Sequence, residues 1–158
     1  MPVLKRRTVK VGDVFQILTS EGVCYALVTH TNNKWRFVVA IFRDFYTKEP
    51  EDFDAVVAGV PQITTTFLIQ EAVSSGLFAL VAHVDLPDHL RNFPTFRSTN
   101  KLKADQTLWF FWEGGTQRRV ERPLTDEEKK YPRGPSLPSA PLLIEMIQNN
   151  YRVERDYI

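Results

Sequence analysis

The stretch that decides the fold reads WRFVVAIFRDF and covers residues 35–45. Its central residues, 37–42, are all apolar, with β-branched and aromatic side chains, which is typical of a central strand covered on both faces. Two more runs with the period-two pattern of strands precede it, at 9–17 and 23–31. Turn residues separate the runs, because Gly22 follows the first and two asparagines follow the second. We therefore expect three sequential antiparallel strands in the middle of the fold.

The next part of the chain alternates short strand patterns with polar connections. Residues 47–54 are polar and acidic, and residues 55–59 are apolar. We interpret residues 47–60 as a connection on the surface that contains a short helix or turn. Residues 86–103 contain two prolines and several charges, which predicts an irregular segment with one short edge strand near Phe96. The other expected elements are strands at 64–69 and 78–84, a helical turn at 71–76 closed by Gly76, and a hairpin at 108–122 around Gly114-Gly115.

A helix and a final strand are expected near the end of the printed sequence. Residues 123–141 hold five prolines, so they lie outside any sheet. Ser139 can cap a helix that begins at Ala140 and ends at Asn149 or Asn150. The apolar face of this helix consists of Leu142, Leu143, Met146 and Ile147. Tyr151–Ile158 alternates apolar and charged residues, which predicts a terminal edge strand that could pair within the chain or across a dimer.

These patterns together predict an α+β fold in a single domain, residues 1–158. We expect a twisted antiparallel sheet, the late helix packed on one of its faces, and the terminal strand at its edge. A chain of 158 residues with 43% hydrophobic residues can bury one core of this kind. Two full-sized domains are not expected at this length.

Charge and cysteine content narrow the classes of function. The 20 basic and 19 acidic residues leave a net charge of +1, which gives no overall field for binding DNA or an anionic membrane. Cys24 is the single cysteine, so the sequence excludes an internal disulfide and a zinc site built on several thiolates. No run is apolar enough for a signal peptide or a membrane span. We expect a cytoplasmic protein without a membrane partner.

Two groups of residues carry side chains that could form a catalytic or metal site. His83, Asp85, Asp88 and His89 carry donors that suit zinc, as in a metal-dependent hydrolase, but Pro87 bends the path between them, and solvated side chains at a strand end are the favoured interpretation. Cys24 and His30 lie six residues apart, about 20 Å along one strand, so they are too distant to form a nucleophile and base. We expect no metal, no cofactor and no catalytic residue.

An aromatic strand near an arginine cluster suggests the second candidate function. Residues 109–112 read Trp-Phe-Phe-Trp and place rings on both faces of a strand, and core packing is the favoured role for them. If Trp109 or Trp112 is exposed, the nearby cations could help to bind single-stranded nucleic acid by stacking. Those cations are Arg118, Arg119 and Arg122.

An acidic segment suggests the leading candidate surface. Within residues 44–54 only Lys48 offsets five carboxylates, so the segment carries about four net negative charges, which is enough to complement a basic protein surface. Solvation alone explains many loops of this composition. The expected protein-binding residues are the carboxylates Asp44, Glu49, Glu51, Asp52 and Asp54, with Tyr46 and Phe53 as aromatic anchors.

The chain also resembles a known family, the bacterial immunity protein 26 family, over about residues 8–100. The departure is Leu77-Phe78-Ala79, where the family has an aromatic residue followed by proline. The residues that carry the resemblance are KVGDVFQI at 10–17, then Gly22, Tyr25, a strand ending in Phe42, the stretch 67–76, Pro94 and Phe96.

The resemblance implies a small cytoplasmic protein that is encoded with a polymorphic or contact-dependent toxin. Such a protein protects the producing cell by binding the cognate toxin domain, and it has no active site. A nuclease toxin carries cations in its cleft, so an inhibitor can present carboxylates where phosphates would bind. We therefore expect a protein that neutralises a bacterial toxin, for which a nuclease is the favoured class, by binding it at the acidic segment.

Overall fold

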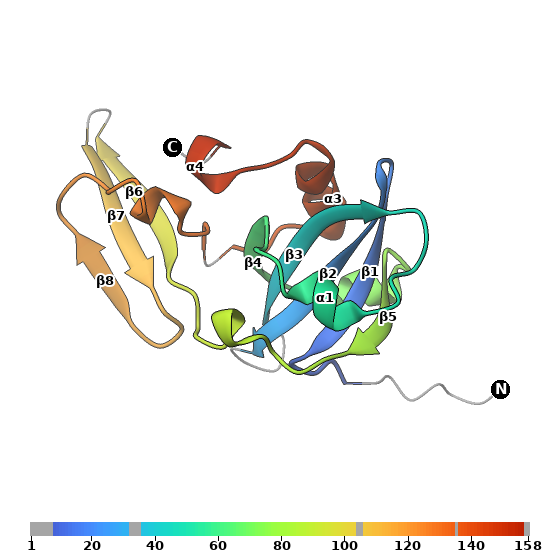
Figure 1. Ribbon diagram of the computed structural model, residues 1–158. Helices are drawn as coiled ribbons and strands as arrows, with labels where there is room; N and C mark the ends of the chain where they lie inside the picture. Colours follow the sequence, from blue (N-terminus) through green and yellow to red (C-terminus); the bar gives the residue numbers. More distant parts are fainter. Residues whose placement is uncertain (1–7, 32–35, 104–105, 135, 157–158) are drawn as a thin grey trace.

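The computed structural model describes residues 8–31, 36–103, 106–134 and 136–156 (Figure 1). The predicted α+β fold is confirmed, but the strands form two sheets rather than one. The larger sheet has five antiparallel strands in the order β4-β3-β2-β1-β5, and the smaller sheet has three in the order β6-β7-β8. Figure 1 shows the smaller sheet standing to one side of the larger.

The larger sheet contains the three predicted central strands as sequential antiparallel neighbours. Register pairs such as Ala26 with Ile41 join β2 to β3, and Ala40 with Thr64 joins β3 to β4. The strands are β1 (Asp13–Thr19), β2 (Gly22–Thr31), β3 (Phe37–Tyr46), β4 (Ile63–Phe67) and β5 (Phe78–His83).

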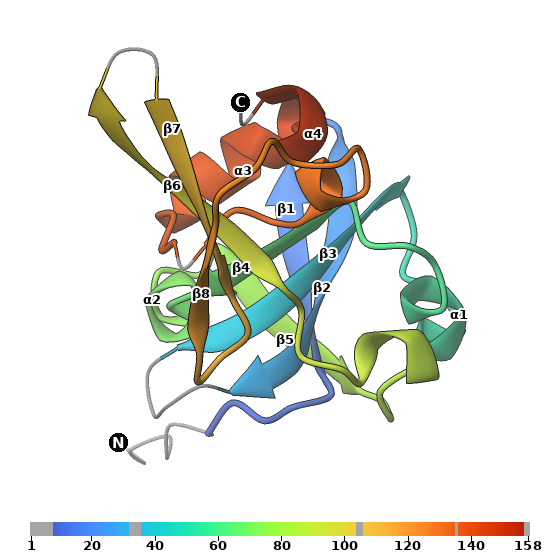
Figure 2. The same ribbon diagram turned by 90° about the vertical axis from the view of Figure 1, so that its left-hand side faces the viewer.

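Both faces of β3 are buried, as the continuous apolar run predicts. Val39 and Ile41 belong to the core on one face, and Ala40 and Phe42 belong to the core on the other. Alternate side chains of a strand point to opposite faces, so a strand between two cores needs apolar residues at every position. Figure 2 shows the resulting layers, with α1 (Phe53–Val57) on one side of the sheet and α2 (Ile69–Ser74) on the other.

The predicted late helix is confirmed as α3 (Ala140–Gln148). It begins where the Ser139 hydroxyl accepts a hydrogen bond from the backbone N–H of Leu142 at 3.3 Å. Leu143 and Ile147 are fully buried in the core that contains Val39 and Ile41. Leu142 was predicted on the buried face, but it is 48% exposed, because the other side of α3 borders a cleft rather than the sheet.

The smaller sheet corrects the prediction for residues 86–103. Residues 88–90 form the short helix η1 (Asp88–Leu90), and β6 (Phe96–Lys103) is an edge strand of the smaller sheet, as predicted, but it is eight residues long rather than short. Its sequence reads as mostly polar, but it pairs with the aromatic strand β7 (Gln106–Trp112) along its length. The predicted hairpin is confirmed, because β7 pairs with β8 (Gln117–Val120).

The terminal edge strand predicted for Tyr151–Ile158 is wrong. Val153–Asp156 forms the helical turn α4, and the last two residues lie outside the described part of the chain. The Asp156 carboxylate accepts hydrogen bonds from the backbone N–H of Arg152 and from Arg155, which stabilises the turn locally. The carbonyl of Val153 accepts from Arg97 instead of from a neighbouring strand.

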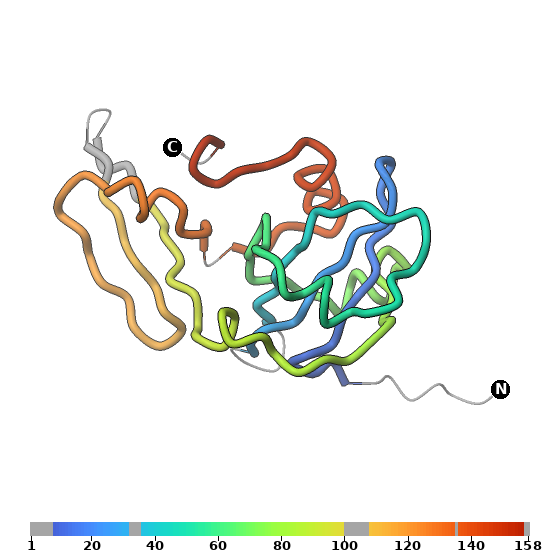
Figure 3. The backbone as a smooth tube through the Cα atoms, in the orientation of Figure 1, coloured from blue at the N-terminus to red at the C-terminus, as the bar shows by residue number. Residues whose placement is uncertain are grey.

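Arg97 joins the smaller sheet to the segments that return from it. Its side chain is almost fully buried and donates to the carbonyls of Tyr131, Lys129 and Val153 at 3.0–3.2 Å. The guanidinium also lies 4.8 Å from the ring centroid of Trp109. Figure 3 traces the chain from β8 through η2 (Glu128–Lys130) back to α3, beside the strand that carries Arg97.

Candidate binding surface

The acidic residues predicted to bind a partner lie together at the end of β3 and the start of α1. We call Asp44, Glu49, Glu51, Asp52 and Asp54 the acidic surface. All five residues are exposed. Among the residues that the structure describes, none of these carboxylates forms an ion pair with a lysine or arginine. Their negative charge is therefore available to a partner.

The acidic surface is fixed to the core by three aromatic rings. The buried ring of Tyr25 packs edge-on against Tyr46 at 5.5 Å and against Phe53 at 5.2 Å between centroids. Burial, followed by the negative charge of Glu49, raises the pKa of Tyr25. The role of Tyr46 and Phe53 as anchors for a partner stays a prediction; their half-buried rings also pack against the core of this chain and connect the acidic segment to it.

Helix α1 adds a second constraint on the acidic surface. Oδ1 of Asp52 accepts a hydrogen bond from the backbone N–H of Asp54 at 2.9 Å and caps the helix. Val56 and Val57 on the same helix are buried against the sheet. The carboxylates of Asp52 and Asp54 therefore project from a capped helix that packs on the sheet, which lowers the entropy lost at these two residues when a partner binds.

The histidines and carboxylates of residues 83–89 do not converge on a metal site. His83 Nδ1 lies 2.8 Å from the buried carboxylate of Asp13, while His89 Nε2 donates to the carbonyl of Gly59 at 2.9 Å. Asp88 pairs with Arg91 at 2.9 Å. Within the described ranges no three His, Cys, Asp or Glu side chains are placed to hold a metal ion. The two histidines instead connect separate segments of the fold.

Cys24 and His30 also have separate surroundings. Burial raises the pKa of the Cys24 thiol to about 12, so the thiolate that a nucleophile requires is not formed near neutral pH. His30 Nε2 donates to the carbonyl of Arg91 at 2.9 Å, and its ring packs against Phe93.

The aromatic strand β7 is used mainly for packing. Trp109 faces Arg97, and Trp112 packs against Phe93 and Phe96 at 5.5 and 5.4 Å between centroids. Phe111 is buried and contacts Tyr131. Both tryptophans are half-buried, so neither presents a fully open ring for base stacking.

The three arginines of the nucleic-acid hypothesis point to different contacts. Arg118 lies over the ring of Phe111 at 4.9 Å, and Arg119 pairs with Glu121 at 3.1 Å. Arg122 forms two hydrogen bonds with the carboxylate of Glu128, at 2.6 and 2.9 Å. Two of these three cations are thus matched by carboxylates, which weakens the case for a phosphate-binding patch.

The contact between Arg122 and Glu128 predicts a pH-dependent stability. The hydrogen bond from Arg122, followed by one from the backbone N–H of Thr125, lowers the pKa of Glu128 from 4.5 to about 2. A depressed native pKa stabilises the fold above pH 4.5, and this stabilisation is lost as the pH falls toward 2. We expect Glu128→Gln to flatten the dependence of the free energy of unfolding on pH in this range, measured by urea denaturation.

Asp126→Asn is the control for that experiment. The Asp126 side chain is fully exposed and 3.9 Å from Lys129, so its removal is expected to leave the pH dependence as it is in the unchanged protein. If the free energy of unfolding depends on pH equally steeply in Glu128→Gln and in the unchanged protein, the Arg122–Glu128 contact is not the source of the pH dependence.

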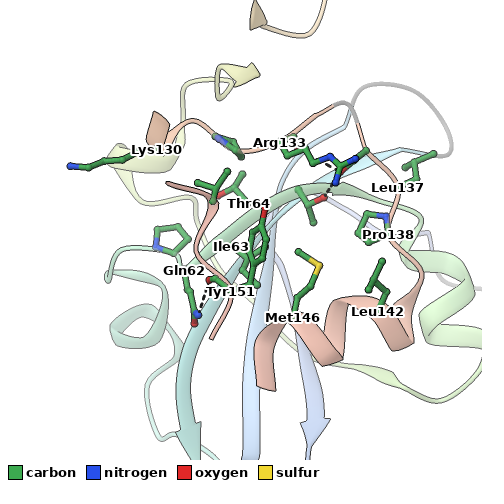
Figure 4. Close-up of a pocket in the computed structure, with 15 residues that line it drawn as sticks. Gln62, Ile63, Thr64, Lys130, Arg133, Leu137, Pro138, Leu142, Met146 and Tyr151 are labelled. Atoms are coloured by element: carbon green, nitrogen blue, oxygen red, sulfur yellow. Dashed lines mark hydrogen bonds between the residues drawn. The ribbon is translucent and has the colours of Figure 1, made fainter. Parts of the chain in front are cut away.

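A cleft of about 520 Å³ is the feature that the sequence did not reveal (Figure 4). It lies between β4, the segment that precedes α3, and α3 itself. Ile63 and Met146 face it, and so do Leu137 and Leu142, which are 42% and 48% exposed. The sequence does contain one sign of the cleft. Residues 137–146 include more apolar residues than one buried helix face needs.

No family model, curated protein or solved structure with which the chain was compared matches it. The resemblance to the immunity protein 26 family therefore stays a prediction from the residues quoted above. Among the described residues, no helix is long and apolar enough to cross a membrane.

Proposed function

We propose that this protein is an immunity protein that binds a basic domain of a cognate bacterial toxin through the acidic surface and neutralises it. The observation that carries the proposal is the set of five exposed carboxylates, which have no lysine or arginine partner among the described residues and lie on a segment whose Tyr46 and Phe53 rings pack against Tyr25. The resemblance to the immunity protein 26 family supplies the class of partner. The proposed action is occlusion by binding, with no catalytic step and no cofactor.

Electrostatics explains why such a surface suits a toxin inhibitor. A nuclease domain attracts phosphates with lysine and arginine, and clustered carboxylates attract the same cations. Opposite charge accelerates association and suppresses binding to wrong partners, and both effects weaken as salt screens the charges. Fast capture is useful to a cell that makes toxin and inhibitor together.

The test is charge reversal on the acidic surface. We expect Glu49→Lys with Glu51→Lys to slow association at low salt by about tenfold or more, because the steering field is reversed locally. The probe is the purified C-terminal domain of the protein encoded immediately upstream, and stopped-flow fluorescence at several salt concentrations measures the association rate. Salt dependence of that rate is expected to shrink in the same variant.

Glu121→Lys with Asp126→Lys is the matched control, since it changes the net charge equally at exposed positions outside the acidic surface. Asp52→Asn supplies a finer test, because asparagine keeps the helix cap and removes only the charge. If the reversed and control variants associate equally fast, the acidic surface is not the docking surface. Association of the unchanged protein with single-stranded nucleic acid, but not with the toxin domain, would favour the second candidate function.

A further inference from the structure

We propose that the acidic surface binds an arginine side chain of the partner, with the hydroxyl of Tyr25 as the buried hydrogen-bond acceptor of the site. This inference rests on the proposed function and adds which side chain of the basic domain is recognised. Carboxylates attract lysine and arginine alike. A fixed hydroxyl at the base of the acidic surface adds a further acceptor, which favours arginine over lysine.

The hydroxyl of Tyr25 is a polar group that the fold does not use. Only 1% of the residue is exposed, and its hydroxyl forms no hydrogen bond with any residue in the described part of the chain. Buried polar groups almost always have a hydrogen-bond partner, and a buried tyrosine usually finds one for its hydroxyl. The unmatched hydroxyl therefore points to a donor that another molecule supplies.

The neighbours of this hydroxyl place it at the acidic surface. Burial, followed by the negative charge of Glu49, raises the pKa of Tyr25, and Tyr46 adds to the effect, so both side chains lie near the hydroxyl. The rings of Tyr46 and Phe53 pack edge-on against the Tyr25 ring. Figure 1 shows the chain turning from the end of β3 back across the sheet to α1, and this connection carries Glu49. The hydroxyl thus lies at the base of the acidic surface.

An arginine side chain matches this combination better than a lysine side chain. The planar guanidinium donates in several directions, so it can reach the Tyr25 oxygen and the Glu49 carboxylate at the same time. Its flat faces also pack against aromatic rings, and those of Tyr46 and Phe53 are only half-buried. A lysine ammonium is more strongly hydrated, so its removal from water beside these rings costs more.

The first test removes only the hydroxyl. Tyr25→Phe keeps the ring that packs against Tyr46 and Phe53. We expect it to raise Kd for the C-terminal domain of the upstream-encoded protein at least tenfold, through faster dissociation. The free energy of unfolding is expected to stay as it is in the unchanged protein, because the hydroxyl forms no hydrogen bond with the described residues. A hydroxyl with only a structural role would give the opposite pair of results.

Tyr131→Phe is the matched control. It removes the hydroxyl of a half-buried tyrosine whose ring packs against Phe111 of the smaller sheet, and it is expected to bind like the unchanged protein. Phe53→Leu is a second variant, which keeps an apolar side chain but removes the aromatic face, and a smaller rise in Kd is expected. Thermal unfolding verifies that each variant is folded.

A second probe tests the choice of cation without the toxin domain. Labelled hexa-arginine and hexa-lysine peptides carry equal charge, so fluorescence polarisation at one salt concentration compares the two side chains. We expect the unchanged protein to bind hexa-arginine about threefold or more tightly than hexa-lysine. Tyr25→Phe is expected to reduce this preference, and Tyr131→Phe is expected to keep it.

The two probes separate this inference from the proposed function. If charge reversal at Glu49 and Glu51 slows association but Tyr25→Phe behaves like Tyr131→Phe with both probes, the arginine site is overturned and the acidic docking surface stands. If Tyr25→Phe weakens binding of the domain but leaves the peptide preference unchanged, the assignment to arginine is overturned. If the domain does not bind but the preference for hexa-arginine depends on Tyr25, the toxin partner is overturned and the site stands. If neither probe responds to Tyr25 or to charge reversal, both proposals are overturned.

Discussion

Replacement of Arg97 by alanine is expected to lower the free energy of unfolding by about 3–5 kcal/mol. The guanidinium is buried, and its hydrogen bonds reach three carbonyls, of Lys129, Tyr131 and Val153. Hydrogen bonds from a charged donor contribute about 1.5–3 kcal/mol each, but the desolvation of the charge offsets part of the gain. Alanine would leave the carbonyls without this donor and a cavity beside Trp109.

Urea denaturation of Arg97→Ala and Arg118→Ala side by side measures this contribution. Both arginines lie over an aromatic ring, at 4.8 and 4.9 Å, but Arg118 is exposed. Loss of an exposed contact of this kind costs about 0.5–1 kcal/mol. Equal destabilisation of the two variants would mean that the buried hydrogen bonds of Arg97 add no net stability.

The second large effect is expected at Gly12, the glycine of the KVGDVFQI opening. Its φ of 96° is a conformation that residues with a side chain rarely adopt, and an added Cβ would overlap the carbonyl oxygen of Val84. The position is constrained because Gly12 donates to the carbonyl of Val28 and accepts from the N–H of Val84. We expect Gly12→Ala to lower the free energy of unfolding by about 3 kcal/mol or more.

Gly76→Ala is the matched control for that substitution. Gly76 also has a positive φ, 80°, just after α2, but apart from its neighbours in the chain no residue has an atom within 4 Å of the position of its Cβ. Only the conformational cost remains there, about 1 kcal/mol. The difference between the two variants in urea denaturation therefore measures the steric overlap at Gly12. If both variants lose the same stability, the contact with Val84 relaxes without cost.

The fold was predictable where local pattern and burial agree. The run at residues 37–42 is apolar at every position because β3 lies between two cores, and Ser139 marks the start of α3 because its hydroxyl is the cap. The smaller sheet was harder to predict. Arg97 reads as a surface charge in the sequence, and no local pattern contains the carbonyls of distant segments or the Trp109 ring that it contacts in its buried position in β6.

The candidate site was predictable to a similar extent. The acidic surface could be predicted because its carboxylates lie within residues 44–54, and neighbours in sequence stay neighbours in space. The inward packing of Tyr46 and Phe53 depends on the position of Tyr25 across the sheet, which no local pattern contains. The cleft combines residues as distant as Ile63 and Met146, so it exists only after folding.

The position of α3 in the sequence also affects the protein while it is being made. All five strands of the larger sheet lie between residues 13 and 83, so their partners are present before the smaller sheet has been synthesised. Leu143 and Ile147 belong to α3 and are synthesised only after all the strands of both sheets. Until then α2 covers only part of the sheet face that includes Val39 and Ile41, and the nascent chain exposes the rest, the kind of apolar surface that chaperones recognise and that aggregates in their absence.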